Sequence, residues 1–194
     1  MQRGVEAFPH TWSVEVLGRP PLIAPARQFM YPQNVPGEED ALSRGALYVQ
    51  VRPAEGTPFL ATCALGFSEP SLPSGIWSCP GPDDLLAVAG GYAYVLHTRN
   101  PAESLFVPMR PVTELVAAPA DGLLLLADFH SVLALDTQGI RWRTARLSWE
   151  GVRLREVRAG HLHGEGWDMF ADREVPFTVD LRTGEHQGGG YRRG

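Results

Sequence analysis

The sequence contains no lysine; histidine aside, all 17 of its basic residues are arginine. This absence excludes Schiff-base chemistry, a P-loop lysine and a lysine general base. Isoleucine is also sparse, whereas arginine, alanine, glycine and proline are abundant, a composition typical of a GC-rich bacterial genome. We therefore expect a bacterial protein whose chemistry does not depend on an amine side chain.

Cysteine is scarce as well, with only Cys63 and Cys79 in 194 residues. Without an export signal, two cysteines do not indicate a disulfide framework, so we expect two reduced, semi-buried thiols. No apolar run approaches the roughly 20 residues needed to cross a bilayer. The N-terminus is interrupted by Glu6, Pro9 and His10 and is not a signal peptide. These absences predict a cytoplasmic protein with no membrane partner.

The chain has no excess of positive charge: its net charge is −5 and its pI is near 5.7. Because a dedicated nucleic-acid binder normally carries a basic excess, we expect no nucleic-acid partner. Familiar catalytic motifs are missing too. No Gly-x-Ser-x-Gly pattern occurs, and Gly90-Gly91 lacks the third glycine and the following helix of a dinucleotide loop.

What the chain does contain is a repeated segment. Residues 85–96 read LLAVAGGYAYVL, and residues 123–135, 38 positions later, read LLLLADFHSVLAL. The same step leads back to Leu47 and forward to His161. A repeat of this length usually corresponds to one four-stranded sheet per unit, as in a β-propeller. The sequence therefore predicts an all-β fold of about four antiparallel, propeller-like sheet units, with an antiparallel β-sandwich or barrel as the alternative.

We expect residues 1–194 to form a single all-β domain; the length suits one well-buried core or two small ones, and no stretch has a helical period. Trp12–Leu17 alternates apolar and polar residues and is predicted to be a half-buried strand, available to complete the fourth unit. Prolines recur too often in residues 18–44 for a helix. We predict an extended connection there, which is functional, disordered, or the cover of an exposed sheet edge. Residues 188–194 carry no strand signal and are predicted to be a disordered tail.

Two segments carry a family resemblance. In each, an apolar strand ends in aspartate, a turn and glycine, and in the first the next strand has an aromatic residue near its start. The first comprises Leu133, Ala134, Leu135, Asp136, Gly139 and Trp142, and the second comprises Val179, Asp180 and Gly184. They resemble blades of the quinoprotein and Trp-Asp repeat propellers. The resemblance covers roughly the last two-thirds of the chain; it implies a propeller fold and transfers no activity.

The residues best suited to hold a metal are His161, His163 and Glu165. Alternate side chains of a strand share a face, so these three would point the same way. Two imidazoles and a carboxylate are the ligands of catalytic zinc or non-haem iron sites. Further ligands could come from the neighbouring Asp168, Asp172 and His186. The alternative is a polar strand face that contacts solvent.

A ligand site is predicted from two further groups. Arg141 and Arg143 share a strand face that could bind a phosphate or carboxylate in bidentate fashion, or could simply be solvated. Trp167 could stack on a planar ligand in a pocket that includes Asp168, or could anchor the last sheet unit.

Taken together, these features predict a non-enzymatic module that binds a protein or a small-molecule ligand and needs no cofactor. The alternative is a metal-dependent, hydrolase-like enzyme with one divalent ion at His161, His163 and Glu165. A homodimer would cover exposed sheet edges.

Overall fold

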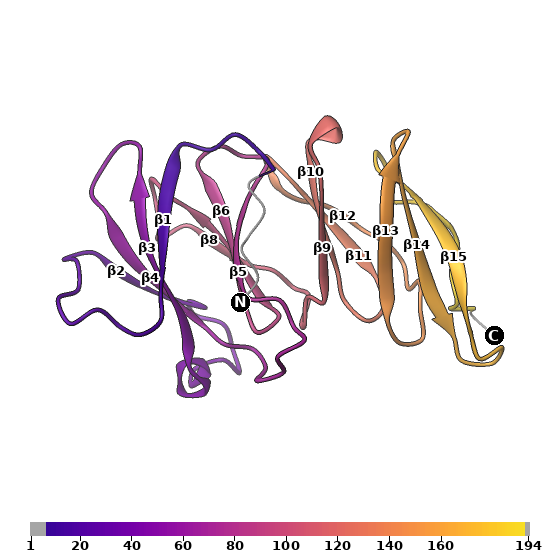
Figure 1. The fold of residues 1–194 in the computed structure, drawn as a ribbon, viewed down its shortest axis with the longest axis horizontal. Helices are drawn as coiled ribbons and strands as arrows, with labels where there is room; N and C mark the ends of the chain where they lie inside the picture. The colour runs from indigo at the N-terminus through magenta and orange to yellow at the C-terminus, as the bar shows by residue number, and fades with distance from the viewer. Residues whose placement is uncertain (1–6, 193–194) are drawn as a thin grey trace. The chain divides into compact units, whose positions relative to one another are not determined.

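The computed structural model describes residues 7–192, which form β-strands joined by loops and two short 3-10 helices. The strands form four sheets of four strands each (Figure 1). Two compact units, residues 1–111 and residues 112–194, contain two sheets each. The prediction of an all-β fold with about four sheet units is therefore confirmed. A single domain over residues 1–194 stays a prediction.

The first sheet has the strand order β1-β3-β4-β2. Its strands are β1 (Trp12–Leu17), β2 (Gln28–Tyr31), β3 (Ala46–Pro53) and β4 (Phe59–Ala64). β1 pairs antiparallel with β3, with Trp12 opposite Pro53 and Leu17 opposite Tyr48. The strand prediction for Trp12–Leu17 is confirmed, but its expected place in the fourth unit is wrong because β1 hydrogen-bonds to β3.

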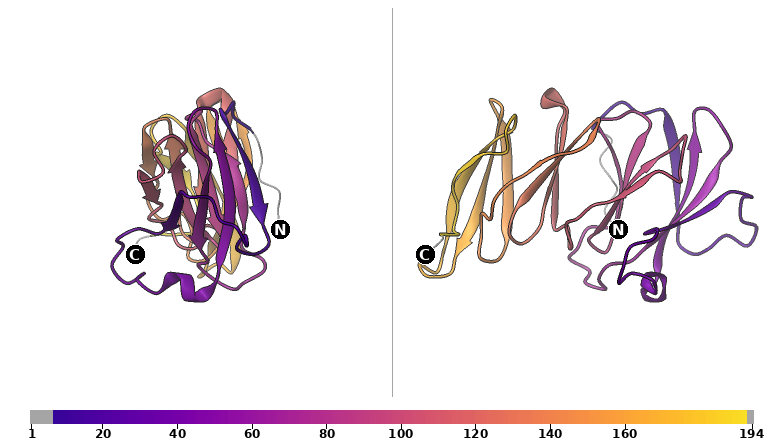
Figure 2. Two further views of the ribbon diagram at one scale, coloured as in Figure 1. Left: turned by 90° about the vertical axis from the view of Figure 1, so that its left-hand side faces the viewer. Right: turned by 180° about the vertical axis from the view of Figure 1, so that it is seen from behind.

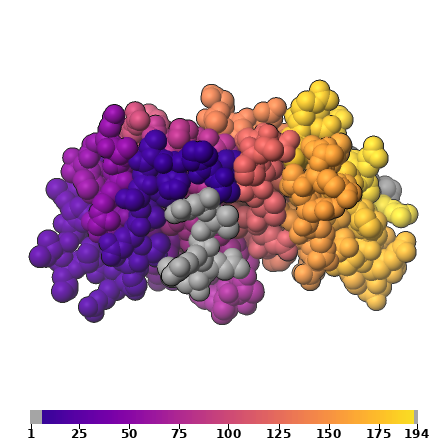
Figure 3. All heavy atoms as spheres, turned by 45° about the horizontal axis from the view of Figure 1, so that its top comes forward, coloured from indigo at the N-terminus to yellow at the C-terminus, as the bar shows by residue number. Residues whose placement is uncertain are grey.

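β2 lies inside the proline-rich connection predicted for residues 18–44. It pairs parallel with β4, with Gln28 opposite Leu60 and Tyr31 opposite Cys63, and so covers that edge of the sheet. A 3-10 helix, η1 (Ala41–Arg44), ends the connection and is visible as a coil in Figure 2. The space-filling view shows the indigo atoms of this N-terminal part at the surface (Figure 3).

Glu38 anchors the end of this connection to the first unit through side-chain hydrogen bonds. Its side chain is only 7% exposed and accepts hydrogen bonds from Arg44 (2.7 Å), Arg110 (3.1 Å) and the Tyr92 hydroxyl (2.7 Å). The guanidinium groups of Arg44 and Arg110 lie 5.3 and 5.9 Å from the centre of the Tyr92 ring. Burial alone would raise the pKa of Glu38, but the hydrogen bonds from Arg44 and Tyr92 and both positive charges lower it below its ordinary value.

The other three sheets are antiparallel meanders of strands that are consecutive in sequence. The second contains β5 (Gly75–Ser78), β6 (Asp84–Ala89), β7 (Tyr92–His97) and β8 (Ser104–Phe106). The third contains β9 (Glu114–Ala118), β10 (Leu123–Ala127), β11 (Val132–Asp136) and β12 (Gly139–Arg143), with the 3-10 helix η2 (Pro119–Asp121) after β9. The fourth contains β13 (Val152–Arg158), β14 (His161–Asp168), β15 (Arg173–Asp180) and β16 (His186–Gly188). The repeated segments are the central hairpins of these sheets, and a four-stranded meander is the architecture of a propeller blade.

The Asp–turn–Gly segments that carry the resemblance are tight turns. The Asp136 carboxylate accepts a hydrogen bond from the Gln138 backbone N–H at 2.7 Å, and Gly139 has a φ of +107°. Gly184 has a φ of +76°, and a Cβ at this position would lie 2.7 Å from the Trp142 ring. Glycine is therefore required at residue 184 both by the backbone conformation and by the contact with this indole.

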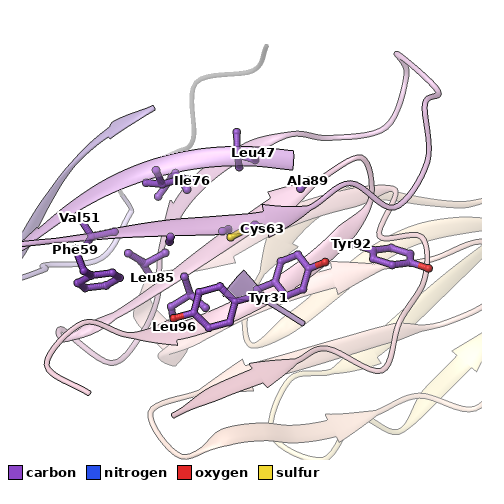
Figure 4. Close-up of a cluster of buried hydrophobic side chains, with 14 of the residues drawn as sticks. Tyr31, Leu47, Val51, Phe59, Cys63, Ile76, Leu85, Ala89, Tyr92 and Leu96 are labelled. Atoms are coloured by element: carbon purple, nitrogen blue, oxygen red, sulfur yellow. The ribbon is translucent and has the colours of Figure 1, made fainter. Parts of the chain in front are cut away.

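The core of the first unit lies between its two sheets. Figure 4 shows Phe59 of the first sheet and Leu85 and Leu96 of the second as neighbouring side chains in this cluster. Tyr31 of β2 is buried in the same cluster, and its hydroxyl donates a hydrogen bond to the Pro101 carbonyl at 2.6 Å. The parallel strand β2 therefore contributes to the core as well as to the sheet.

The core of the second unit lies between the third and fourth sheets. Leu125 of β10 packs in a cluster with Leu162, Phe177 and Val179 of the fourth sheet. A Cβ at Gly164 would lie 2.3 Å from the Phe177 ring, so this ring occupies the space beside the glycine. The fourth sheet thus buries one face, while its other face carries mainly polar side chains.

Both cysteines are buried and unpaired. Burial raises the pKa of the Cys63 and Cys79 thiols, and the nearby Asp84 carboxylate adds to the effect at Cys79. Neither thiol is therefore ionised near neutral pH, and neither has the reactivity of a catalytic nucleophile.

The tail predicted for residues 188–194 begins at the last residue of β16. The Gly189 N–H donates a hydrogen bond to the Pro176 carbonyl (2.9 Å), and the Tyr191 N–H donates to the Leu147 carbonyl (3.1 Å). These bonds attach residues 189–191 to the second unit. Residues 193 and 194 lie outside the described residues.

Candidate protein-binding surface

The three predicted metal ligands share one face of β14, as the strand alternation predicts. His161 is exposed, whereas His163 and Glu165 are half-buried. Glu165 accepts two hydrogen bonds from Arg155, at 2.5 and 3.1 Å, and His163 lies beside the Thr178 hydroxyl. Within residues 7–192, no group of three or more His, Cys, Asp or Glu side chains is arranged to hold a metal ion. The metal site stays a prediction that this geometry does not support.

One acidic residue near β14, Asp180, is the last residue of β15 and supports the turn that follows. Asp180 accepts hydrogen bonds from the backbone N–H groups of Arg182 and Thr183, which lower the pKa of its carboxyl. It borders a shallow hollow of about 320 Å³ on the second unit. The hollow is lined by His161, Thr178, Asp180, Glu185, His186 and Gln187. Its polar groups come from one sheet and one turn of the second unit.

The predicted arginine site lies in the third sheet, where both guanidinium groups have partners. Arg143 contacts the Asp128 carboxylate at 2.8 Å and the Ser131 hydroxyl at 2.9 Å. Arg141 lies 3.4 Å from Asp136. These contacts fix the two turns beside β11, and anion binding by Arg141 and Arg143 stays a prediction.

A group of aromatic side chains gathers at one end of the fourth sheet. We define the aromatic patch as Arg146, Trp149, Met169, Phe170 and Tyr191. Arg146 and Trp149 come from the loop before β13, Met169 and Phe170 from the β14–β15 turn, and Tyr191 from the residues after β16. No sequence motif joins these three segments. The signal available in the sequence was the adjacent apolar pair Met169-Phe170.

Backbone contacts bring the three segments of the aromatic patch together. The Trp149 N–H donates to the Trp167 carbonyl at 3.1 Å, and Tyr191 is attached through the Leu147 carbonyl. The buried Asp168 carboxylate accepts hydrogen bonds from the backbone N–H groups of Phe170 and Ala171, at 3.0 and 3.1 Å. Two predicted ligand-binding residues, Trp167 and Asp168, therefore lie next to the aromatic patch and support it.

The rings of the aromatic patch form a fixed arrangement. The Trp149 ring centre lies 5.5 Å from that of Phe170 and 4.9 Å from that of Tyr191, both edge-to-face. The Arg146 guanidinium lies 5.2 Å from the Trp149 ring centre and 4.8 Å from the Tyr191 ring centre. It also donates hydrogen bonds to the Ser148 and Trp149 carbonyls, at 2.9 and 2.7 Å. Three of the patch side chains thus hold one another in place.

The outer part of the aromatic patch is apolar and accessible. Phe170 is 78% exposed and Met169 is 52% exposed. Two acidic residues, Glu150 and Asp172, are exposed beside the patch and have no partner within residues 7–192. Aromatic residues, methionine and arginine are the residue types enriched at protein interfaces. The arrangement can therefore bind an apolar segment flanked by positive charge.

The indole N–H of Trp149 is buried and is the side-chain polar atom that lacks a hydrogen-bond partner within the described residues. Leaving such a donor unpaired costs about 1–3 kcal/mol. We therefore expect Trp149→Phe, which keeps an aromatic ring and removes this donor, to change the free energy of unfolding by less than about 1 kcal/mol. Trp149→Ala should lower it by about 2 kcal/mol because the ring contacts are lost. Urea denaturation measures the free energy of unfolding of both variants. If Trp149→Phe loses as much stability as Trp149→Ala, the indole N–H of the wild type has a partner.

No known protein family matches this sequence, and no curated protein matches it. No helix within residues 7–192 has the length and apolar character that a membrane crossing requires.

Solved structures that are similar to this chain include two that contain Nup159. One is the N-terminal domain of Nup159, with 16% sequence identity and a TM-score of 0.38. The other is a Saccharomyces cerevisiae complex of a Dbp5 variant with Nup159, a Gle1 variant, IP6 and ADP, with 12% identity and a TM-score of 0.41. Each alignment covers 97% of this chain and 52% of the other chain, so this chain spans about half the length of those it matches. At these TM-scores the similarity carries no information about function.

Proposed function

We propose that this chain is a non-enzymatic protein-interaction module that binds an extended, proline-containing apolar segment on its aromatic patch. The observation that carries the proposal is the exposure of Phe170 and Met169 on a support that Arg146, Trp149 and Tyr191 hold in place. Aromatic surfaces recognise proline-rich segments because a polyproline II chain is already extended and loses little entropy on binding.

The size of the exposed area predicts weak, reversible binding. Burying a phenylalanine or methionine side chain contributes about 1.5–3 kcal/mol. Association costs at least about 4 kcal/mol of translational and rotational free energy. Two anchor side chains and the contacts around them therefore support an affinity in the micromolar range or weaker, which suits a transient partner.

Binding of displayed peptides tests the proposal. With the purified chain as bait, a random-peptide library should yield peptides that contain proline and aliphatic residues. The variant Met169→Ser/Phe170→Ser should bind these peptides at least about tenfold more weakly in fluorescence anisotropy, because both anchors are lost. Ile140→Ser is the matched control, since Ile140 is an exposed apolar residue of β12 outside the aromatic patch. Selected peptides that bind the patch variant as tightly as the wild type would contradict the proposal.

The metal-dependent alternative has no supporting observation within residues 7–192, and one divalent ion at His161, His163 and Glu165 stays a prediction. The cytoplasmic location, the bacterial source and the absence of a nucleic-acid partner also stay predictions.

A further inference from the structure

We infer that the segment bound by the aromatic patch is a loop of a second copy of this chain, so that the protein self-associates. The loop is residues 18–27, which join β1 to β2 and read GRPPLIAPAR. The inference rests on the proposed function and names the partner for that surface.

The loop presents the most exposed large apolar side chains of the described residues. Leu22 is 95% exposed and Ile23 is 92% exposed. Apolar residues at this exposure, next to each other on a loop, mark a binding surface more often than single exposed residues do. Leu22 and Ile23 therefore form an apolar projection on the loop between β1 and β2.

The loop is also restrained in shape. Pro20, Pro21 and Pro25 flank the projection, and proline fixes φ near −65°. Its C-terminal end is attached by Arg27, which donates a hydrogen bond to the Thr57 carbonyl at 2.9 Å and lies 5.6 Å from the Phe29 ring centre. A segment that is extended before binding loses less conformational entropy when it binds.

The loop and the aromatic patch match in chemistry. Proline-rich segments pack on aromatic rings, and the aliphatic pair fits beside the exposed Phe170 and Met169. Their charges are opposite as well. Arg19 of the loop is exposed and without a partner within residues 7–192, and so are Glu150 and Asp172 beside the patch. Two surfaces of one chain thus carry complementary apolar and charged groups that the isolated chain leaves unpaired.

A lipid surface suits the loop less well. An aliphatic projection with basic neighbours can enter an anionic bilayer. However, the net charge of −5 opposes attraction to anionic lipid. Arg27, one of the two loop arginines, is already bound to the Thr57 carbonyl. A protein surface with negative charge is the better match.

Each copy carries one loop and one aromatic patch, so two copies can exchange both contacts, or each copy can bind two different neighbours. We therefore expect the wild-type protein to form species larger than a monomer as its concentration rises.

Mixing two variants tests this inference directly. Leu22→Ser/Ile23→Ser removes the loop anchors, and Met169→Ser/Phe170→Ser removes the patch anchors. In sedimentation velocity each variant alone should stay monomeric, whereas an equal mixture should form a 1:1 complex, since one intact loop and one intact patch remain. Exposed Leu42 of η1 provides the control, and Leu42→Ser should associate like the wild type. A wild type that stays monomeric up to about 1 mM, or variants that associate as it does, would overturn the inference.

A charge exchange provides a second test. Arg19→Glu should weaken association at least about tenfold at low salt, and mixing it with Glu150→Arg/Asp172→Arg should restore it. If the mixture does not associate, Arg19 does not pair with Glu150 and Asp172, and the inferred contact between loop and patch is wrong.

A synthetic GRPPLIAPAR peptide separates this inference from the proposed function. If library peptides bind the aromatic patch and this peptide does not, self-association is wrong and the interaction module stands. If every peptide binds Met169→Ser/Phe170→Ser as tightly as it binds the wild type, both the proposed function and the self-association are wrong. Binding of the monomeric chain to vesicles of anionic phospholipid, lost in Leu22→Ser/Ile23→Ser, would assign the loop to a membrane and overturn the inference.

Discussion

Replacing Phe177 by alanine is expected to lower the free energy of unfolding by about 3–5 kcal/mol. The ring is 2% exposed and packs with Leu162 and Val179 between the third and fourth sheets. It also occupies the space beside Gly164, where a Cβ would lie 2.3 Å from the ring. No neighbouring side chain from residue 164 can fill the cavity, so the packing contacts are lost without replacement. A typical domain has only about 5–15 kcal/mol of stability, and the second unit should therefore unfold early.

Urea denaturation followed by far-UV circular dichroism measures this loss. Phe177→Leu is the first comparison and should cost much less, because a branched aliphatic side chain keeps part of the contact. Phe129→Ala is the control for loss of a ring, since Phe129 is 39% exposed against 2% for Phe177, and its removal should cost less than about 1 kcal/mol. A Phe177→Ala variant as stable as the Phe129→Ala control would show that the second core is not packed as described.

Replacing Glu38 by glutamine is expected to cost about 2 kcal/mol at pH 7 and to reduce the sensitivity of the fold to acid. In the wild type, Arg44, Arg110 and Tyr92 all donate to one buried carboxylate. The folded-state pKa of Glu38 lies below its unfolded value. Its contribution is therefore complete above the unfolded pKa, which is near 4.3 in model peptides, and is lost as the pH falls through the folded pKa.

Thermal unfolding between about pH 2 and pH 7 checks this prediction. The wild type should lose stability below about pH 4.3 more steeply than Glu38→Gln, whose amide does not titrate. Glu55→Gln is the matched control, because the Glu55 side chain is 78% exposed and lies 3.6 Å from Arg99. If the wild type and Glu38→Gln follow the same pH dependence, the Glu38 cluster does not stabilise the first unit.

The repeat predicted the fold well because it reflects local structure. Each copy holds two apolar strands and a tight turn, and these became the central hairpins β6–β7 and β10–β11. The strand Trp12–Leu17 was also predicted, but its partner was not. Alternation of apolar residues shows which face of a strand is buried; it does not show which distant strand provides the hydrogen bonds.

The structure also contains a strand that the sequence could not indicate. β2 has four residues, lies among prolines and pairs in parallel with β4, about 30 positions away along the chain. Neither its length nor its composition distinguishes this segment from a loop. The burial of Tyr31 beside Phe59 and the hydrogen bond from Tyr31 to the Pro101 carbonyl hold this segment against the sheet, and both depend on residues distant in the sequence.

In the candidate site, too, local features were predicted and contacts between distant segments were not. The shared face of His161, His163 and Glu165 was predicted, because strand alternation is a local property. Residues two apart along one strand lie about 6–7 Å apart, however, and a metal site needs ligands that converge from several directions. The aromatic patch was missed because Trp149, Phe170 and Tyr191 come from three segments that only the folded chain brings together.

The pairing of β2 with β4 has a consequence for how copies of the chain can exchange parts. β2 is short and lies at the edge of the sheet, so its departure from β4 would leave the antiparallel pairs of the first sheet in place, but it would expose Tyr31 and break the hydrogen bond from this residue to the Pro101 carbonyl. The vacated edge of β4 would then present unpaired N–H and C=O groups that accept a strand from any chain with the same sequence. β2 of another copy would match this edge in the same register and would bury its own Tyr31 in the vacated place, so strand exchange of this kind would link chains through backbone hydrogen bonds and core packing together.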